Sequence, residues 1–494
     1  TLSLDNYYGM LQQTGNKGLI VVNYGYARYG RANDPVAAAA HLAADWVRYD
    51  NGRTKFWEVG NECFGSWEAG YRIDRSKNKD GQPEFITGAL YGQHFKVFAD
   101  SMKAAAQQIG ATIYIGAILL EHAPANWEDA TAQSWNSGVI PQVTSKADFY
   151  IVHSYYTPYN TNSSASEILG TATSVTQGMM NYVTQNVQAN GGAAKPIALT
   201  EFNIFAVGSM QQVSHINGMH AAITTGELMK TKFGQATRWD LANGWDNGND
   251  HGMFSQGDEP GIPKWNPRPD FYHLYYFGKY CGDHLVNSSV AGSPDVLSYA
   301  TLFSSGQAGI MLFNKGLGNQ IVKVNFQNFP VGARYYWYSL SGSNDNGEFS
   351  RKVLVNGKAP TNATGGPLDY ATLKPDAAVS NDDVKITVPG RSAVYMLVER
   401  NMTVTATNDI DPTDRIVQVL NNPSTDGSFT LKLNGFTAAD KFAMSLIDAT
   451  GKLIYSKNFT WSPFVRFDKQ LAPGMYGIKI QTKRGVTTKK LIVW

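Results

Sequence analysis

The sequence is poor in cysteine: its 494 residues include only Cys63 and Cys281, which form no Cys-x-x-Cys pair. This excludes a zinc ribbon and a disulfide-rich scaffold, and leaves open a single bridge between the two thiols. Long apolar runs are also missing. No run reaches the roughly 18 residues of a transmembrane helix, so we expect no membrane insertion. The net charge is only +2, which gives no reason to expect nucleic acid as a partner.

Aromatic residues, in contrast, are plentiful, with 11 Trp and 26 Tyr. Indole rings suit clefts that bind sugars, because the C–H faces of a sugar ring stack on them. Most Trp side chains of a protein nevertheless pack in its core or on its surface without binding anything, and each Trp here has that alternative.

Residues 19–280 alternate between short apolar runs and longer stretches with a helical pattern. The apolar runs are GLIVVNYG (18–25), KFWEVGNE (55–62), ATIYIGAILL (111–120), ADFYIVHSYY (147–156), KPIALTEF (195–202) and QATRWDLAN (235–243). Their continuous apolar character is typical of parallel strands that are covered on both faces. One helical stretch follows Asp34, a capping residue, and has Pro35 in its first position. The alternation predicts an α/β fold with helices outside a parallel sheet, as in a (β/α)8 TIM-type barrel.

Every one of these apolar runs ends in polar residues. They are Asn23, Asn61, Glu62, Glu121, His122, His153, Glu201 and Asp240. A single polar residue in such a place can be a solvated strand exit, but a polar group after all six runs is hard to explain by packing. In a (β/α)8 barrel the carboxyl ends of the strands form the active face. We therefore expect a functional site at this end of the sheet.

The helical pattern stops near residue 285, and short alternating strands with Gly, Asn and Pro turns follow. They predict an antiparallel β-sandwich. A polar stretch at 401–415 indicates a boundary, and further short strands after it predict a second small sandwich. The predicted domains are thus a barrel at 1–284, a β-sandwich at 285–400 and a C-terminal domain at 401–494.

Glu62 and Glu201 end the second and the fifth apolar run, three strand steps apart. Three steps around a barrel can place two side chains on opposite sides of one cleft. A pair of carboxyl groups is what breaking a glycosidic bond requires: one donates a proton to the leaving oxygen, and the other attacks the anomeric carbon or activates water.

The run WEVGNECFGSWEAG (57–70) resembles the acid/base motif of glycoside hydrolase clan A, whose Asn-Glu pair ends the fourth barrel strand. ALTEFN (198–203) is similar to the nucleophile motif at the end of the seventh strand, and VHSYY (152–156) stands between them in the expected order. The spacing GNE-x-x-G-x-W-x-x-G is closest to family 51, which contains α-L-arabinofuranosidases and some endoglucanases. The resemblance covers about residues 5–400.

This resemblance implies specific roles. Glu62 would be the general acid and base, with a raised pKa, and Glu201 the nucleophile of a retaining mechanism. Asn61 would bind the sugar 2-hydroxyl, and His153 and Tyr155 would position Glu201 or the sugar. Candidates to line the sugar subsite are Asn23, Trp239 and Trp245. No metal and no cofactor are implied.

The strand count has a further implication. If Glu62 follows strand four, residues 18–25 form strand three, and SLDNYYGMLQQTG (3–15) is the helix before it. The first two barrel strands are then absent from this sequence. We expect that the sequence is a fragment of a longer precursor, or that another segment or chain supplies these strands.

Residues 415–494 contain NPSTDGSFTLKLNG, LIDATGKLIYSK, LAPGMYGIKI and TTKKLIVW. These motifs, in this order, resemble the C-terminal sorting domain of the type IX secretion system. The implied partner is the secretion machinery, and the implied location is the cell surface or the medium. A generic carbohydrate-binding sandwich is the alternative, but the segment lacks an obvious aromatic platform.

Three functions remain open from the sequence. The first choice is a secreted retaining α-L-arabinofuranosidase acting on cell-wall polysaccharide. The second is an endo-β-glycanase of the same clan, since the clan motifs do not specify the substrate. The third is a surface protein that binds glycans without cleaving them.

Overall fold

The computed structural model describes residues 3–381, 383–401, 417–434, 436–437, 440–468, 470–482 and 485–493. The chain forms two compact units. The first contains residues 1–274 together with 341–370, and the second contains residues 275–340 together with 371–494. The predicted boundary stretch at 401–415 lies, apart from its first residue, outside the described residues.

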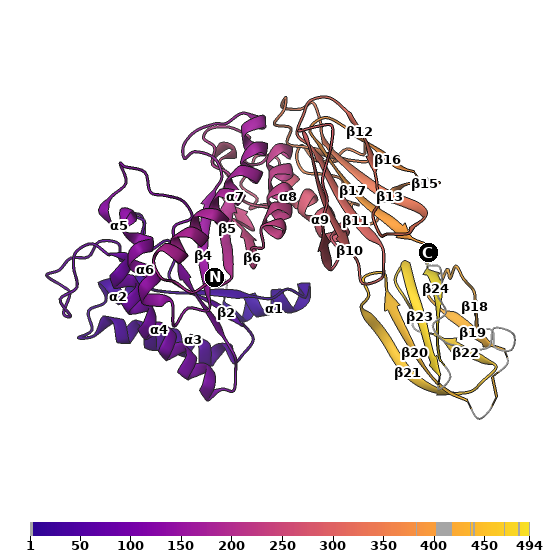
Figure 1. Cartoon of the computed structure of the whole chain (residues 1–494), viewed down its shortest axis with the longest axis horizontal. Coiled ribbons are helices and arrows are strands. Elements are labelled where there is room, and N and C mark those ends of the chain that lie inside the picture. The colour runs from indigo at the N-terminus through magenta and orange to yellow at the C-terminus, as the bar shows by residue number, and fades with distance from the viewer. Residues whose placement is uncertain are drawn as a thin grey trace. The chain divides into compact units, whose positions relative to one another are not determined.

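The first unit is built on a parallel sheet of six strands that follow one another in chain order. The strands are β1 (Leu19–Val22), β2 (Phe56–Val59), β3 (Tyr114–Ile118), β4 (Phe149–Tyr155), β5 (Ile197–Asn203) and β6 (Gln235–Arg238). Four of them, β2, β4, β5 and β6, are labelled in Figure 1. Among the described residues, β1 and β6 each pair with one neighbour, so the sheet is open at both edges. The six predicted parallel strands are confirmed, and each is shorter than its apolar run.

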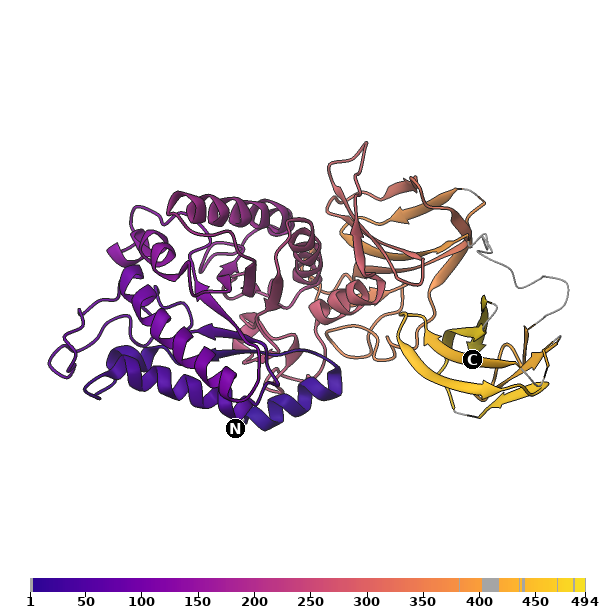
Figure 2. The same ribbon diagram turned by 60° about the horizontal axis from the view of Figure 1, so that its bottom comes forward.

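Helices connect consecutive strands and lie outside the sheet (Figures 1 and 2). They are α3 (Pro35–Asp50), α4 (Gly88–Gln108), α5 (Ala130–Gln133), α6 (Trp135–Val143), α7 (Ala165–Ala189) and α8 (His215–Lys230). As predicted, Asp34 caps α3 by accepting a hydrogen bond from the backbone of Ala37, and Pro35 fills the first position. The predicted helix at 3–15 forms α1 (Leu4–Thr14).

The concave side of the sheet has an apolar floor. Phe56, Phe149, Ile151 and Ala198 pack together there. Gly116 on β3 leaves room for this floor, because a Cβ at that position would lie 2.4 Å from the Phe149 ring and 2.5 Å from Ile151. Side chains alternate along a strand, so the next inward positions of β2, β4 and β5 lie one layer closer to the carboxyl ends.

A second sheet system forms the β-sandwich of the second unit. Its main sheet has the order β13-β17-β11-β10-β9, and β12 pairs with β16. The bounds are β9 (His284–Val286), β10 (Val296–Leu302), β11 (Ala308–Asn314), β12 (Gln320–Val324), β13 (Val331–Gly342), β15 (Asp376–Val379), β16 (Val384–Val388) and β17 (Ser392–Arg400). A buried cluster that includes Ile310, Leu312, Val388 and Met396 forms its core. The predicted sandwich is confirmed.

The C-terminal strands form a smaller sandwich with its own core. One sheet has the order β18-β19-β22 and the other β21-β20-β23-β24. The bounds are β18 (Val417–Leu420), β19 (Phe429–Leu433), β20 (Lys441–Asp448), β21 (Leu453–Thr460), β22 (Phe464–Phe467), β23 (Gly474–Thr482) and β24 (Gly485–Val493). Phe429, Met444, Ile478 and Leu491 are buried between the two sheets.

Several elements have no counterpart in the sequence-based expectation. They are α2 (Gly25–Tyr29), α9 (Pro269–Tyr280), the short parallel pair β7 (Ala242–Asn243) and β8 (Phe254–Ser255), a 3-10 turn (Asp246–Gly248) and β14 (Val353–Val355). Residues 341–370 fall within the predicted sandwich yet belong to the first unit. Tyr272 shows how they are fixed there, since its hydroxyl donates to the carbonyl of Gly366 at 2.9 Å. Such contacts join residues about a hundred positions apart, which local patterns do not reveal.

Cys63 and Cys281 form no disulfide bond in the structure. Among the described residues, no helix combines the length and the apolar character needed to cross a membrane.

Candidate active site

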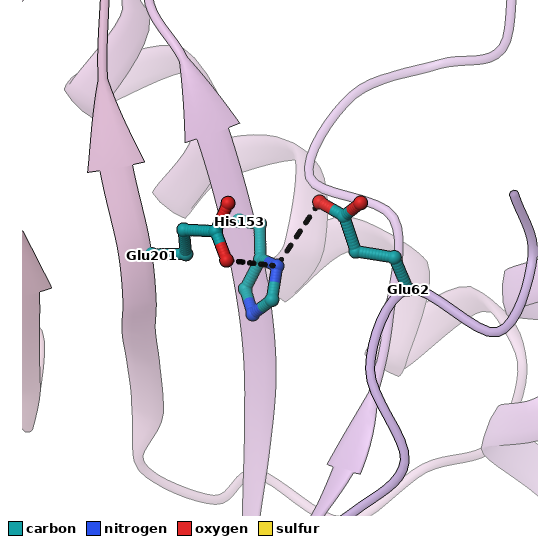
Figure 3. Close-up of side chains that lie close together, drawn as sticks. All are labelled: Glu62, His153 and Glu201. Atoms are coloured by element: carbon teal, nitrogen blue, oxygen red, sulfur yellow. Dashed lines mark hydrogen bonds and ion pairs between the residues drawn. The ribbon is translucent and has the colours of Figure 1, made fainter. Parts of the chain in front are cut away.

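Three side chains meet where β2, β4 and β5 end. Glu62 follows β2, His153 lies on β4 and Glu201 lies on β5. The imidazole stands between the two carboxyl groups (Figure 3). Its Nδ1 is 3.1 Å from Oε1 of Glu62 and 3.7 Å from Oε2 of Glu201. One carboxylate oxygen of each glutamate lies within 4.8 Å of the other. The two glutamates predicted from the motifs are thus brought together.

Each glutamate also has a hydrogen-bond donor of its own. The indole Nε1 of Trp67 donates to Oε2 of Glu62 at 2.8 Å. The hydroxyl of Tyr155 donates to Oε1 of Glu201. Both carboxyl groups are largely buried, with 18% of the Glu62 side chain and 12% of the Glu201 side chain exposed. Each donor holds its carboxyl group in place within the cluster.

The backbone after β2 aims Glu62 at this site. Gly60 has φ 81°, and a Cβ there would lie 2.5 Å from the sulfur of Cys63 and 2.8 Å from Cβ of Tyr24. Only glycine fits this bend without strain. Glu62 itself has φ 37°, and its carbonyl accepts a hydrogen bond from Gly65 at 2.7 Å. The chain therefore turns sharply between the strand and the glutamate.

The pKa values of the two glutamates do not follow the order expected for an acid, Glu62, and a nucleophile, Glu201. Burial raises the pKa of Glu62, but the hydrogen bond and the charge of His153, with the bond from Trp67, outweigh it and leave the pKa below its usual value. Burial raises the pKa of Glu201, and His153 and Tyr155 offset only part of that rise. The expected raised pKa of Glu62 is therefore wrong for this arrangement. The reason is geometric, because the imidazole lies nearer to Glu62 than to Glu201.

The surroundings of His153 favour its protonated form. Burial opposes its charged form, yet the hydrogen bond to Glu62 and the charges of Glu201 and Glu62 raise the pKa of the imidazole. Its other nitrogen, Nε2, is 3.1 Å from Oγ1 of Thr200. The ring is therefore held at both nitrogens, with Nδ1 directed at the two carboxyl groups.

The composition of the cluster, two carboxyl groups and one imidazole, is also one that can hold a metal ion. Zinc binds such ligands at about 2.0–2.2 Å, so two ligands on opposite sides of an ion lie at most about 4.4 Å apart. The 4.8 Å spread of the three ligating atoms is wider, and the 3.1 Å approach of His153 to Glu62 is a hydrogen-bond distance. We interpret the group as a hydrogen-bonded cluster.

Three other predicted site residues lie near the carboxyl ends of the strands but make no contact with the catalytic carboxyl groups among the hydrogen bonds described. Asn61 precedes Glu62 and donates through Nδ2 to Glu68 at 2.8 Å. Asn23 is exposed at the end of β1, and its side chain accepts a hydrogen bond from the backbone of Tyr26. Trp239 follows β6 and is 43% exposed. The three residues lie at strand ends, as the sequence predicts.

Trp245 has a different environment. The guanidinium groups of Arg268 and Arg351 lie over its ring, at 5.5 and 5.0 Å from the centroid. Its backbone N–H donates to Asp258 at 2.9 Å. Cations over an indole hold it in place by cation–π attraction. These contacts support a packing role for Trp245, and its role as a sugar-lining residue stays a prediction.

Four residues of the site were not singled out from the sequence. Trp67 lies within the motif at 57–70, and Thr200 directly precedes Glu201. Both residues could therefore be found from their positions in the motifs. Glu58 alternates with Phe56 on the inward side of β2 and is 1% exposed. Phe205 stacks on Tyr155 with 4.2 Å between ring centroids, and only the fold reveals this contact.

Comparison with known families identifies the C-terminal domain. Residues 419–494 match the secretion system C-terminal sorting domain. The predicted type IX sorting tail is confirmed, and it indicates a protein that is secreted or displayed at the cell surface. None of the curated proteins compared with the chain matches it.

Solved structures resemble the rest of the chain. The family 51 arabinofuranosidase of Xanthomonas axonopodis pv. citri is 15% identical, with a TM-score of 0.52, over 80% of this chain and 78% of its own. The family 44 xyloglucanase of Paenibacillus polymyxa is 10% identical, with a TM-score of 0.52, over 80% and 83%. A 4-O-α-L-rhamnosyl-β-D-glucuronidase of Fusarium oxysporum 12S is 11% identical, with a TM-score of 0.53, over 80% and 79%.

At these identities the likeness shows the fold. The chain has a barrel-type parallel sheet and a following β-sandwich like those of these structures, with a type IX sorting domain after them.

Proposed function

We propose that the protein is a secreted retaining glycoside hydrolase that cleaves cell-wall polysaccharide. The observation that supports this most directly is the approach of Glu62 and Glu201, with carboxylate oxygens within 4.8 Å. Retaining enzymes hold their two carboxyl groups about 5–5.5 Å apart, whereas inverting enzymes leave about 6.5–9.5 Å for a water molecule. The spacing supports double displacement.

The proposed reaction has two steps. The Glu201 carboxylate attacks the anomeric carbon while Glu62 gives a proton to the glycosidic oxygen, so the C–O bond breaks and a glycosyl ester of Glu201 forms. Water then attacks the same carbon, Glu62 takes a proton from it, and the ester breaks. The nucleophile regains its charge and the acid regains its proton.

His153 is the source of the proton that Glu62 needs in the first step. The proton on Nδ1 is one hydrogen bond of 3.1 Å from Glu62. The imidazolium can pass this proton to Glu62, which gives it to the leaving oxygen and is then ionised for the second step. The bond from Tyr155 stabilises the ionised form of Glu201, as a nucleophile requires. Asn61, next to Glu62, would bind the 2-hydroxyl of the sugar by leaving its bond to Glu68.

The first choice of substrate is an α-L-arabinofuranoside. It is supported by the spacing GNE-x-x-G-x-W-x-x-G, in which Trp67 also binds Glu62, and by the family 51 fold likeness. The test is a panel of aryl glycosides with the full chain. Release of the aryl group from the α-L-arabinofuranoside, with the product first seen by NMR in the α configuration, is the expected result. Turnover of another glycoside in its place would refute the substrate, and first formation of the β product would refute retention.

A second candidate, an endo-β-glycanase, is favoured by exposed aromatic rings on the loops after β2, β3 and β4. Trp67, Trp127 and Tyr159 are 68%, 85% and 77% exposed. Loops that follow parallel strands share one face of the sheet. Rings on that face can stack on sugars beyond the one at the catalytic pair. A fall in polysaccharide viscosity that precedes the release of small sugars would support this candidate.

The binding-only alternative makes a different prediction. Both Glu201→Ala and the unchanged protein would then bind an oligosaccharide equally well, and neither would cleave any substrate of the panel. For an enzyme, we expect the variant to keep binding and to lose turnover.

A further inference from the structure

Trp67 combines a hydrogen bond to the proposed acid with a ring that is largely exposed. Its indole Nε1 donates to Oε2 of Glu62 at 2.8 Å, while the residue is 68% exposed. A tryptophan that only donates a hydrogen bond needs no exposed ring, as the fully buried Trp135 shows by donating to the carbonyl of Ile118. The exposed ring of Trp67 therefore asks for a function of its own.

The turn after β2 holds this indole from one side. A Cβ at Gly65 would lie 2.3, 2.4 and 2.8 Å from three ring carbons of Trp67, so the bare backbone of a glycine packs against the ring. The N–H of Gly65 donates to the carbonyl of Glu62 at 2.7 Å, and the N–H of Glu68 donates to the carbonyl of Gly65 at 3.0 Å. Phe64 meets the indole at 89°, with 6.3 Å between centroids. The ring is thus fixed to the same turn as Glu62.

The two carboxylate oxygens of Glu62 face different neighbours. Oε1 faces Nδ1 of His153, with Glu201 beyond it, and the other oxygen lies on the far side of the carboxyl group (Figure 3). This second oxygen, Oε2, accepts the hydrogen bond of Trp67. In the proposed reaction the anomeric carbon lies at Glu201 and the glycosidic oxygen at Glu62. The group that leaves with this oxygen therefore extends past Glu62 on the side of Trp67.

The leaving group has to come close to the indole. A general acid lies within about 2.6–3.2 Å of the oxygen that it protonates. Because Nε1 of Trp67 is 2.8 Å from the same carboxyl group, the atoms next to that oxygen lie beside the exposed ring. The polar tip of the indole is already bound to Glu62, which leaves its apolar ring for a ligand. The C–H face of a sugar ring is the apolar surface that a glycosidic substrate offers there.

We propose that Trp67 is the binding platform for the leaving group, and that this group is itself a sugar ring whose C–H face stacks on the indole. This rests on the proposed roles of Glu62 and Glu201. The hydrogen bond to Glu62 orders the ring before the substrate arrives, so little side-chain freedom is lost when the sugar stacks. Trp67 then acts on the acid through its N–H and on the substrate through its ring. The preferred substrate is one in which the cleaved bond joins two sugars.

The second step of the reaction separates the two roles of Trp67. The glycosyl ester of Glu201 can be attacked by water or by a hydroxyl group of a sugar seated on Trp67. In either case the attacking O–H gives its proton to Glu62, a new C–O bond forms at the anomeric carbon, and the ester C–O bond breaks. Because Glu62 is the base for both, the ratio of transfer to hydrolysis does not depend on its pKa. The ratio therefore measures the platform alone.

The test is transfer from an aryl glycoside that the protein turns over to methyl β-D-xylopyranoside, an uncharged sugar with C–H faces. We expect Trp67→Leu to lower the ratio of transfer to hydrolysis about tenfold. Trp67→Phe keeps a ring without the N–H, so it should retain most of the ratio. Trp46→Leu is the matched control, since Trp46 lies on α3 outside the sheet, and it should retain the ratio fully. Equal ratios in Trp67→Leu and the unchanged protein, or no transfer by the unchanged protein, would overturn the proposal.

A binding measurement without turnover separates the platform from the proposed hydrolase function. In Glu201→Ala with isotope-labelled tryptophan, the indole N–H signal of Trp67 is assigned in NMR spectra by its loss in Trp67→Phe. Added xylotriose or arabinotriose should shift this signal and leave that of Trp46 in place. A shift in a protein that hydrolyses no glycoside would reject the hydrolase and keep the platform. A signal that neither sugar moves would reject the platform, even where hydrolysis is observed.

Discussion

The imidazole Nδ1 of His153 lies 3.1 Å from Oε1 of Glu62, which makes the two residues a hydrogen-bonded acid–base pair. In the proposed mechanism the proton required by the leaving group resides on this pair. The lowered pKa of Glu62 and the raised pKa of His153 are two sides of the same contact. His153 is therefore the neighbour from which Glu62 can receive the proton that it gives to the leaving oxygen.

Removing the carboxyl group of Glu62 should affect substrates according to their leaving groups. For Glu62→Ala we expect turnover of natural glycosides, whose leaving oxygen needs a proton, to fall by about 10²–10⁴-fold. Aryl glycosides with acidic phenols need no such proton, so their glycosyl-enzyme should still form. Azide should then speed their turnover by attacking the intermediate without general base help. Equal losses on both kinds of substrate, with no azide effect, would contradict an acid/base role.

Trp67→Phe should widen the alkaline side of the activity profile. The indole hydrogen bond lowers the pKa of Glu62, so its loss raises that pKa, and the proton needed for catalysis persists to higher pH. The measurement is the alkaline limb of kcat/KM. Trp46→Phe is the matched control, since Trp46 is a half-buried residue of α3 outside the site. A limb that moves downward in Trp67→Phe would contradict the assignment.

Tyr155→Phe should act on the opposite limb. The hydroxyl of Tyr155 lowers the pKa of Glu201, and its removal lets that pKa rise further. A nucleophile with a higher pKa is ionised only at higher pH, so the acid limb of kcat/KM should move up. Because Phe205 stacks on the ring, the phenyl group should keep its place. An unchanged acid limb would mean that Glu201 is not the group that must be ionised.

The chemistry of the site was more predictable from the sequence than its electrostatics. Glu62 and Glu201 follow from strand-end positions and from motifs, because parallel strands gather their carboxyl ends at one edge. Which carboxyl group the imidazole favours depends on two distances from Nδ1 of His153, 3.1 Å to Glu62 and 3.7 Å to Glu201. Strand order alone does not contain that difference, and the predicted pKa of Glu62 was wrong for this reason.

Contacts distant in sequence explain what else was missed. Glu58 looks like an interruption of an apolar strand until the fold places it below His153. The segment at 341–370 lies within the bounds of the predicted sandwich, yet it belongs to the first unit. There Arg351 contacts both Glu259 and the ring of Trp245. The predicted sheet, in contrast, depended only on local periodicity and was confirmed.

The loop after β6 should depend on a buried ion pair. Arg268 is 1% exposed and lies 2.7 Å from Asp250 and 3.3 Å from Glu259. Arg268→Met leaves Asp250 buried without its partner, while Glu259 keeps Arg351, and we expect this to cost about 3–5 kcal/mol of unfolding free energy. Urea unfolding followed by Trp fluorescence measures it. Arg72→Met removes an exposed pair with Glu84 and should cost at most about 1 kcal/mol. Similar losses of unfolding free energy in the two variants would contradict the dependence of this loop on the buried ion pair.

Gly60→Ala should disable the site through the backbone. A residue with a Cβ at φ 81° loses roughly 1–2 kcal/mol, and here the Cβ would also collide with Cys63 and Tyr24. The turn that aims Glu62 must then shift, so we expect a large fall in kcat together with lower thermal stability. Gly81→Ala is the matched control, because Gly81 has φ 73° and no heavy atom within 4 Å of its Cβ position. It should lose a little stability and keep its kcat. If both variants kept kcat, the position of Glu62 would not depend on this bend.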